Sequence, residues 1–187
     1  MKNNSILLTE QAGNALSIQN ILRINEIWRK VFPENKPLDP ANRKPFTNDR
    51  FFMVFKPKNG IIAVGRLRPI RGINFQGRLF NIAGVADIVS TVRKQGYGSK
   101  VVKAMHKHLQ DRHQTGIGFC RPDNSPFYQK CGFQIAKDLG RRFIYQESTE
   151  KIKQGKGDVL FVNGEDRLVE KILEHTEEKV LIPCPHW

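Results

Sequence analysis

Apolar residues recur at helical spacing near the start of the chain. Between residues 17 and 32 they fall three or four positions apart, and Ser17, a residue type that favours helix N-caps, stands before the first of them. This pattern predicts an amphipathic helix. Four prolines follow between positions 33 and 45, and because proline interrupts both helices and central strands, a loop is predicted there.

The next part of the chain is rich in β-branched and aromatic residues. Asn59-Gly60 is a strong hairpin signal, and the stretch RGINFQG at 71–77 is turn-like. The apolar runs around these turns predict three antiparallel strands. The runs are residues 51–55, 61–67 and 79–92.

Helical spacing returns between Gly98 and Arg112, where the apolar residues share one face and most lysines lie elsewhere. A short apolar strand, TGIGFC, follows. We then expect a miniature helix that Ser125 caps and Gly132 ends. Two closing strands are predicted next, FQIAKD and RRFIYQE.

The last part of the chain predicts a strand, a helix and a terminal strand after a basic loop. The corresponding stretches are KIKQGKG, DVLFV, DRLVEKILEH and VLIPCPHW. No repeat and no sharp boundary interrupts the pattern. We therefore expect one domain over residues 1–187, with a core at about 5–148 and a C-terminal extension at about 149–187.

Composition is that of a globular protein, with 39% hydrophobic and 26% charged residues among 187. The formal net charge of +13 should attract an anionic partner, such as a phosphate-rich cofactor, an acidic acceptor or nucleic acid. The basic residues are spread along most elements, which does not favour dedicated nucleic-acid binding.

Without a long apolar run or a leader-like start, we expect no membrane association and a cytoplasmic location. Three widely spaced cysteines fit that reducing compartment.

The stretch RKQGYGS at 93–99 has chemical meaning because it lies between a long strand and a helix. The first turn of a helix offers backbone N–H groups without internal partners and favours negative charge. Gly96 and Gly98 leave these amides open, and Arg93, Lys94 and Lys100 add positive charge. The stretch could therefore hold a diphosphate.

Other phosphate loops fit this stretch less well. The chain has no GxxxxGK[ST], and Val101 stands where a dinucleotide fingerprint has its third glycine. An ordinary strand-to-helix turn that holds two glycines remains the alternative.

A second motif, FYQKCGF at 127–133, follows the first after one helix and one strand. The order R-x-x-G-x-G, then F-Y-x-K-x-G-F, resembles the GNAT superfamily of acyl-CoA N-acyltransferases over about residues 5–148. The resemblance implies an α/β (α+β) fold with a central, mostly antiparallel mixed sheet flanked by helices. It also implies that the sheet splays at two parallel central strands, residues 78–90 and 115–121, and that a C-terminal strand-helix-strand extension follows.

The resemblance implies acetyl-CoA as the acyl donor and no metal. The pantetheine amides would pair with a strand backbone, and the pyrophosphate would rest on the amides of the turn. The implied coenzyme-binding residues are Ala86, Asp87, Ile88, Arg93, Lys94, Gln95, Gly96, Tyr97, Gly98, Ser99 and Asn124.

The implied reaction is direct attack of a primary amine on the thioester in a ternary complex. Strand N–H groups near Ile88 or Val89 would stabilise the oxyanion. Tyr128 matches the family position whose phenol often protonates the leaving sulfur, and the alternative is a packed aromatic. Asp87 is the candidate base, acting directly or through water, and the alternative is a solvated or salt-bridged carboxylate.

The chain departs from the family pattern at several positions. Ser90 stands where many members have proline, and Asn124 lies closer to Tyr128 than in many members, so a helix cap is the alternative for Asn124. Cys131 is expected to be a small buried filler. Three histidines on or after the basic helix are expected to lie on the surface, and none has metal-ligand spacing. They are His106, His108 and His113.

Acceptor choice in this superfamily usually depends on the first helix, the next loop and the chain end. Trp28, Phe46 and Trp187 are available for apolar contact with an acceptor, unless they only cover the core. The net charge opposes a polycationic acceptor and favours a small amine that bears a carboxylate or phosphate. A non-catalytic GNAT-fold module that binds CoA or nucleic acid, and an acyltransferase for longer acyl groups, remain open. The sequence does not specify an oligomeric state.

Overall fold

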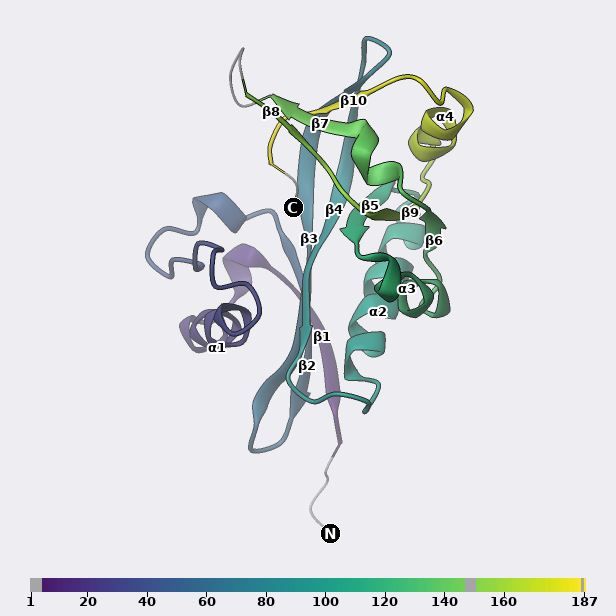
Figure 1. Cartoon of the computed structure of the whole chain (residues 1–187). Coiled ribbons are helices and arrows are strands. Elements are labelled where there is room, and N and C mark those ends of the chain that lie inside the picture. Colours follow the sequence, from purple (N-terminus) through teal and green to yellow (C-terminus); the bar gives the residue numbers. More distant parts are fainter. Residues whose placement is uncertain (1–4, 147–150, 186) are drawn as a thin grey trace. The chain divides into compact units, whose positions relative to one another are not determined.

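The computed structural model describes residues 5–146, 151–185 and 187, and Figure 1 labels its helices and strands. The chain divides into two compact units. The first contains the residues up to Arg68 together with Ala86–Met105, and the second contains Pro69–Val85 together with the residues from His106 onward. Three elements contribute to both units: β3 (Gly60–Phe75), β4 (Arg78–Ser90) and α2 (Tyr97–Asp111).

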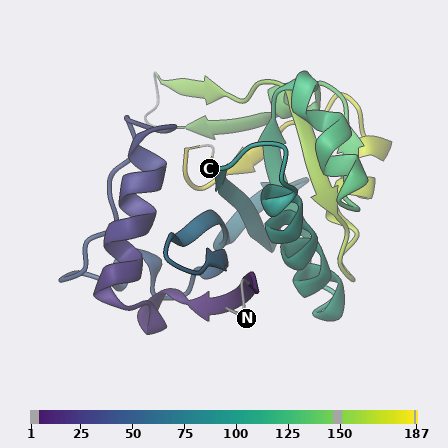
Figure 2. The ribbon, with the colours of Figure 1, turned by 90° about the horizontal axis from the view of Figure 1, so that it is seen from below.

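The first unit begins with β1 (Leu7–Ala12) and α1 (Ile18–Arg29), which Figure 2 shows in purple, joined by the short 3₁₀ turn η1 (Gly13–Ala15). A second 3₁₀ turn, η2 (Lys44–Phe46), precedes β2 (Arg50–Lys56). Strand β2 pairs antiparallel with β1 on one side and with β3 on the other.

Helix α1 confirms the predicted amphipathic helix. Ser17 caps it, because its Oγ accepts a hydrogen bond of 3.1 Å from the backbone N of Asn20. The helix ends at Arg29, before the predicted boundary, where Val31 N and Phe32 N both donate to Trp28 O and the chain turns toward Pro33. Its buried side chains are Ile21, Ile24, Ile27 and Trp28.

The predicted Asn59-Gly60 hairpin is present between β2 and β3, where Gly60 has φ of +65°. Strand β3, however, is 16 residues long and includes most of the stretch predicted as a second turn. Only Gln76 and Gly77 form the turn into β4. Alternating burial keeps the chain extended through this region, because Ile73 and Phe75 belong to the core of the second unit.

Helix α2 approaches β3 closely in the first unit because position 65 has no side chain. A Cβ on Gly65 would lie 2.9 to 3.0 Å from side-chain atoms of Ile88, Val101 and Met105. The apolar face predicted for this helix is confirmed, since Val101 and Met105 are fully buried.

The second unit is built on the strand order β6-β9-β5-β4-β3-β10-β7-β8. Strands β4 and β5 are parallel and pair at Ala83 with Gly116 and at Gly84 with Ile117. Strand β10 is parallel to β7 and antiparallel to β3. These elements are β5 (Gly116–Cys120), the 3₁₀ turn η3 (Pro122–Asn124), α3 (Ser125–Lys130), β6 (Gln134–Ala136), the 3₁₀ turn η4 (Leu139–Arg142), β7 (Phe143–Gln146), β8 (Ile152–Gln154), β9 (Asp158–Val162), α4 (Leu168–Glu174) and β10 (Val180–Ile182).

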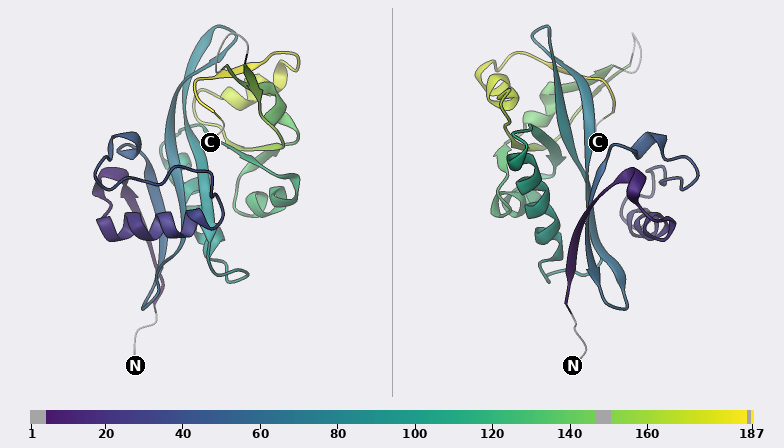
Figure 3. Two further views of the ribbon diagram at one scale, coloured as in Figure 1. Left: turned by 60° about the vertical axis from the view of Figure 1, so that its left-hand side comes forward. Right: turned by 180° about the vertical axis from the view of Figure 1, so that it is seen from behind.

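The segment after residue 150 belongs to the sheet of the second unit. Strand β9, predicted as DVLFV, lies between β5 and β6 and pairs antiparallel with both. Figure 3 follows the yellow C-terminal segment from α4 into β10. The predicted basic loop KIKQGKG instead contains β8, because β7 provides an antiparallel partner for residues 152–154.

Each unit has its own hydrophobic cluster. In the first unit α1 packs on β2, and Trp28 stacks on Phe51 with ring centroids 6.1 Å apart. In the second unit Phe119 lies edge-on to Phe143 at 5.3 Å and to Trp187 at 5.2 Å. Full burial of one such aromatic side chain contributes about 1.5 to 3 kcal/mol.

The first unit also buries a carboxylate. The side chain of Asp49 is 5% exposed, and its Oδ2 accepts a hydrogen bond of 3.1 Å from Arg66 Nη1. Burial raises the pKa of Asp49 to about 6, with Asp87 adding to the rise and Arg66 and Arg68 opposing it. A carboxyl whose pKa is raised by folding stabilises the protein at low pH, and this contribution is lost as the pH rises through about 6.

We predict that Asp49→Asn gains stability relative to the unsubstituted protein as the pH rises. The difference in the free energy of unfolding should grow by roughly 1 to 3 kcal/mol between pH 4 and pH 7.5, because only the carboxyl must ionise inside the protein. Urea unfolding at four pH values across this range measures it. A difference that does not change with pH would contradict the buried charge.

Candidate functional site

The turn that joins β4 to α2 in the first unit is exposed and contains two left-handed residues (Figure 1). Lys94 has φ of +58° and Gly96 has φ of +74°. Apart from Gly96 itself and its two chain neighbours, no heavy atom lies within 4 Å of a Cβ built on Gly96, so no other part of the chain fills the space above this residue. Thr91 anchors the start of the turn, because its backbone N and its Oγ1 both donate to Ile62 O.

Helix α2 begins at Tyr97, one residue before the predicted start. Lys100 N donates to Gly96 O at 3.0 Å, which closes the first helical turn. The structure thus brings the predicted pyrophosphate-binding residues together: Arg93, Lys94, Gln95 and Gly96 are exposed, Gly98 and Ser99 are half-buried, and Tyr97 is buried. What this turn binds stays a prediction.

Asp87 interrupts the regular backbone of β4. Its φ is +51°, and its carbonyl oxygen accepts a hydrogen bond of 2.9 Å from Trp28 Nε1 on α1. Its neighbours Ala86, which is buried, and Ile88, which is half-buried, continue the strand. Asp87 is therefore a left-handed residue in an otherwise extended strand, with its carbonyl bonded to a side chain.

The carboxylate of Asp87 is part of an ion-pair network. Arg66 Nε donates to Asp87 Oδ2 at 2.5 Å and Arg66 Nη1 donates to Asp49, while the guanidinium lies 4.9 Å from the ring centroid of Trp28. Asn35 Nδ2 donates to the other oxygen, Oδ1, at 3.2 Å. The salt-bridge alternative for Asp87 is thus present in the structure. The contact of Oδ1 with Asn35 is longer than that of Oδ2 with Arg66, and it is exposed.

A pocket in the first unit lies beside this network. Its volume is about 340 Å³, and Trp28 and Asn35, both bonded to Asp87, belong to its lining. Two hydrogen bonds of 2.8 Å between the side chain of Asn25 and the backbone of Leu38 hold the loop against α1. The lining residues come from α1 and the following loop: Leu22, Asn25, Glu26, Trp28, Arg29, Phe32, Pro33, Asn35, Lys36 and Pro37.

Tyr128 lies on α3 in the second unit and is half-buried. Burial raises the pKa of its phenol to about 12, with smaller contributions from the neighbouring Cys120 and Cys131 thiols. The phenol is therefore protonated at neutral pH and can donate a hydrogen bond or a proton. Phe127 packs edge-on to the ring at 5.1 Å.

A buried aspartate that the sequence did not single out fixes the start of α3. Asp158, on β9, accepts a hydrogen bond of 2.6 Å from Ser125 Oγ and one of 2.9 Å from Asp138 N. Ser125 is the first residue of the helix instead of the predicted cap. An aspartate at the head of the apolar run DVLFV was the available signal for this role.

Asn124 occupies the N-cap position of α3, is exposed, and makes no side-chain capping bond. The capping alternative for its side chain is therefore wrong.

The burial expected for Cys131 is confirmed, whereas the exposure expected for His108 is not. Cys131 is buried, as expected of a filler, and Cys120, Cys131 and Cys184 form no disulfide. The surface position expected for His108 is wrong: it is 7% exposed, on the core side of α2. Among the described residues no three His, Cys, Asp or Glu side chains gather as a metal-ligand group.

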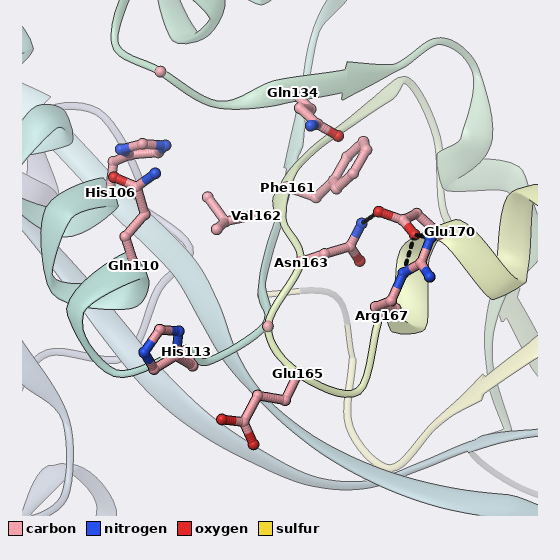
Figure 4. A pocket seen from close by; sticks show the side chains of 12 residues that line it. His106, Gln110, His113, Gln134, Phe161, Val162, Asn163, Glu165, Arg167 and Glu170 are labelled. Atoms are coloured by element: carbon pink, nitrogen blue, oxygen red, sulfur yellow. Dashed lines mark hydrogen bonds and ion pairs between the residues drawn. The ribbon is translucent and has the colours of Figure 1, made fainter.

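A second pocket lies in the second unit and is lined by none of the predicted coenzyme-binding or catalytic residues (Figure 4). Its volume is about 670 Å³. Gln110, His113 and Gln134 line it, together with Asn163, which donates to Glu170. His106 also lines it, and burial lowers the pKa of that imidazole.

The three aromatic residues predicted for acceptor contact differ in what they contact in the structure. Phe46 is 3% exposed and packs edge-on to Phe51 in the core. The prediction that Phe46 contacts an acceptor is therefore wrong, and the alternative that it covers the core holds. Trp28 lines the pocket in the first unit. Trp187 packs against Gly84 in the second unit and donates its indole N–H to Ile117 O at 2.9 Å.

Within the described part of the chain, no helix is long and apolar enough to cross a membrane.

Comparison with solved structures identifies the fold. Escherichia coli ElaA superposes with a TM-score of 0.56 at 14% identity, over 83% of this chain and 99% of that one. An acyl-CoA N-acyltransferase from Pseudomonas aeruginosa gives 0.54 at 12% identity, over 83% and 97%. A conserved protein from Enterococcus faecalis V583 gives 0.53 at 14% identity over 72% of this chain, which spans only 33% of that protein.

Comparison with family models identifies the family. The acetyltransferase (GNAT) domain model matches residues 14–136, about two thirds of the chain, and includes both predicted motifs. A search of curated proteins found no match. The mixed sheet flanked by helices agrees with the fold of the structural neighbours. The chain therefore belongs to the GNAT family of acetyltransferases.

Proposed function

We propose that this protein transfers an acetyl group from acetyl-CoA to the primary amine of a small acceptor, by direct attack in a ternary complex. The observation that carries the proposal is the open turn before α2, in which Gly96 is left-handed and no side chain beyond its two chain neighbours fills the space above it. A diphosphate needs such an approach to backbone amides at a helix N-terminus. Arg93, Lys94 and Lys100 supply positive charge around it.

The coenzyme would extend from this turn along β4. Its pyrophosphate would contact the residues from Arg93 to Ser99, and its pantetheine arm would pair with the backbone of Ala86, Asp87 and Ile88. Asn124 is exposed and remains a proposed contact. The turn would offer amide N–H groups and cations to the pyrophosphate oxygens, and the strand backbone would offer N–H donors and C=O acceptors to the pantetheine amides.

Transfer requires the amine nitrogen to bond to the thioester carbonyl carbon and the C–S bond to break. Strand N–H groups near Ile88 or Val89 would stabilise the oxyanion that forms between these steps. Tyr128, protonated because its pKa is about 12, would donate to the departing sulfur. Since a thiol has an ordinary pKa of about 8.5, complete proton transfer is uphill, and hydrogen bonding would supply most of the effect.

Asp87 is the proposed proton acceptor for the amine, directly or through water. Its Oδ1 contacts Asn35, which also lines the pocket of about 340 Å³. That pocket combines apolar walls with Arg29 and Lys36. We therefore propose it as the acceptor site, suited to a small amine that carries an apolar group and a carboxylate or phosphate.

We predict that acetyl-CoA raises the melting temperature of the protein and that Gly96→Glu abolishes the rise. A ligand at 100 times its Kd adds about 2.7 kcal/mol, or roughly 5 to 10 °C for a chain of this size. The substituted carboxylate would occupy and repel the diphosphate. A thermal-shift series with acetyl-CoA and longer acyl-CoA species measures the effect.

Gly77→Glu is the matched control for this series. Gly77 has φ of +73° against +74° for Gly96, and both positions are open, so the two substitutions cost similar backbone strain. Gly77→Glu should keep the full ligand-induced rise. No rise with any acyl-CoA in the unsubstituted protein would overturn the proposed function.

We predict that Tyr128→Phe lowers turnover by about 100-fold while the Kd for acetyl-CoA changes less than about twofold. The phenol O–H acts on the leaving sulfur and contributes little to the ground state. Release of free CoA thiol measures turnover, and Tyr145→Phe, on β7 of the same unit, is the control. Unchanged turnover would make Tyr128 a packed aromatic and no more.

We predict that an amine bearing an apolar group and a carboxylate is acetylated with a kcat/KM at least about tenfold above that of its carboxamide. Lys36→Gln should reduce this ratio, because it removes a cation at the proposed pocket. The same thiol-release assay over paired acceptors measures both. Equal kcat/KM for acid and amide would contradict the proposed acceptor class.

A further inference from the structure

Arg66 connects four parts of the first unit through its guanidinium. It donates to Asp49 in the loop before β2 and to Asp87 on β4, and it lies over Trp28 of α1, while its own backbone belongs to β3. Its side chain is only 14% exposed. Such a half-buried, doubly paired arginine is geometrically fixed, because its planar guanidinium donates to two carboxylates at once.

The backbone of Asp87 needs support from its surroundings. A left-handed conformation costs an L-residue about 1 to 2 kcal/mol, and aspartate tolerates it better than most. Its two shorter hydrogen bonds hold Asp87 there: Trp28 Nε1 donates to its carbonyl, and Arg66 Nε donates to its carboxylate, while the contact with Asn35 is longer and exposed. These contacts act on the main chain and on the side chain of one residue, so together they define the position of β4 at this point.

We propose that Arg66 is a positioning residue, held by Asp49 and Trp28, that fixes the left-handed conformation of Asp87 so that β4 receives the thioester arm of the coenzyme. This inference rests on the proposed function. Arg66 would touch neither the coenzyme nor the acceptor. Its effect would pass through Asp87, whose neighbours Ala86 and Ile88 are the proposed pantetheine contacts.

Arg68 provides an internal comparison. It lies two residues further along β3, on the same face as Arg66, and it lies close enough to Asp49 to lower the pKa of that carboxyl. Within the described residues the side chain of Arg68 makes no hydrogen bond or ion pair. Replacing either arginine removes one positive charge from the same face, but only the Arg66 change removes a hydrogen bond and an ion pair from Asp87.

The test compares two ligands by calorimetric titration. Acetyl-CoA reports on the turn and on β4, whereas 3′-phosphoadenosine diphosphate, its nucleotide portion, reports on the turn alone. We expect Arg66→Met to weaken acetyl-CoA binding at least tenfold while nucleotide binding changes less than twofold. Arg68→Met should leave both affinities within twofold of the unsubstituted protein. A merely structural loss would weaken both ligands together.

The Arg66→Met protein could fail to fold, because the substitution removes the partner of Asp49 and Asp87. A second variant is therefore included. Trp28→Phe keeps an aromatic ring and removes the N–H that bonds Asp87 O, so it should also weaken acetyl-CoA selectively. Selective loss in either variant supports the positioning role. If the unsubstituted protein binds both ligands and both folded variants bind acetyl-CoA normally, the inference about Arg66 is overturned alone. If the unsubstituted protein binds neither ligand, the proposed function is overturned with it.

Discussion

Left-handed backbone at three positions shapes the end of β4 and the turn into α2, and the proposed coenzyme site depends on it. Asp87, Lys94 and Gly96 have φ of +51°, +58° and +74°. Glycine adopts this conformation without steric cost, whereas Asp87 is held there by Trp28 and Arg66. The proposed anion site at the helix N-terminus thus depends on a short stretch of chain that departs from regular structure, and neighbouring hydrogen bonds stabilise the departure.

The proposed catalytic residues are divided between the two compact units. The coenzyme turn, Asp87 and the pocket beside α1 lie in the first, whereas Tyr128 lies in the second. The second unit depends on its C-terminal segment, since Asp158 on β9 holds Ser125 at the start of the helix that carries Tyr128. A strand that arrives 30 residues after Tyr128 therefore governs the placement of the proposed proton donor.

Local chemistry made some elements predictable. Ser17 begins α1 because its hydroxyl accepts a bond from a backbone N–H, and Asn59-Gly60 turns β2 into β3 because glycine tolerates positive φ. The turn predicted over RGINFQG is confined to its last two residues, because the burial of Ile73 and Phe75 keeps the strand extended before them. The exposure expected for His108 was wrong because charged neighbours on α2 dominated a pattern in which position 108 faces inward.

The sequence by itself determined the two motifs, their order and the family to which the chain belongs, because glycine and charge patterns act within a few residues. Only the tertiary structure decided that Arg66 meets Asp49 and Asp87, and that β9 enters the sheet between β5 and β6. These paired residues lie 17 to 46 positions apart, since position 66 pairs with 49 and 87, and residues 116–120 pair antiparallel with 158–162. Contacts over these separations depend on how whole strands pair and which side chains lose water together, and no local pattern encodes that choice.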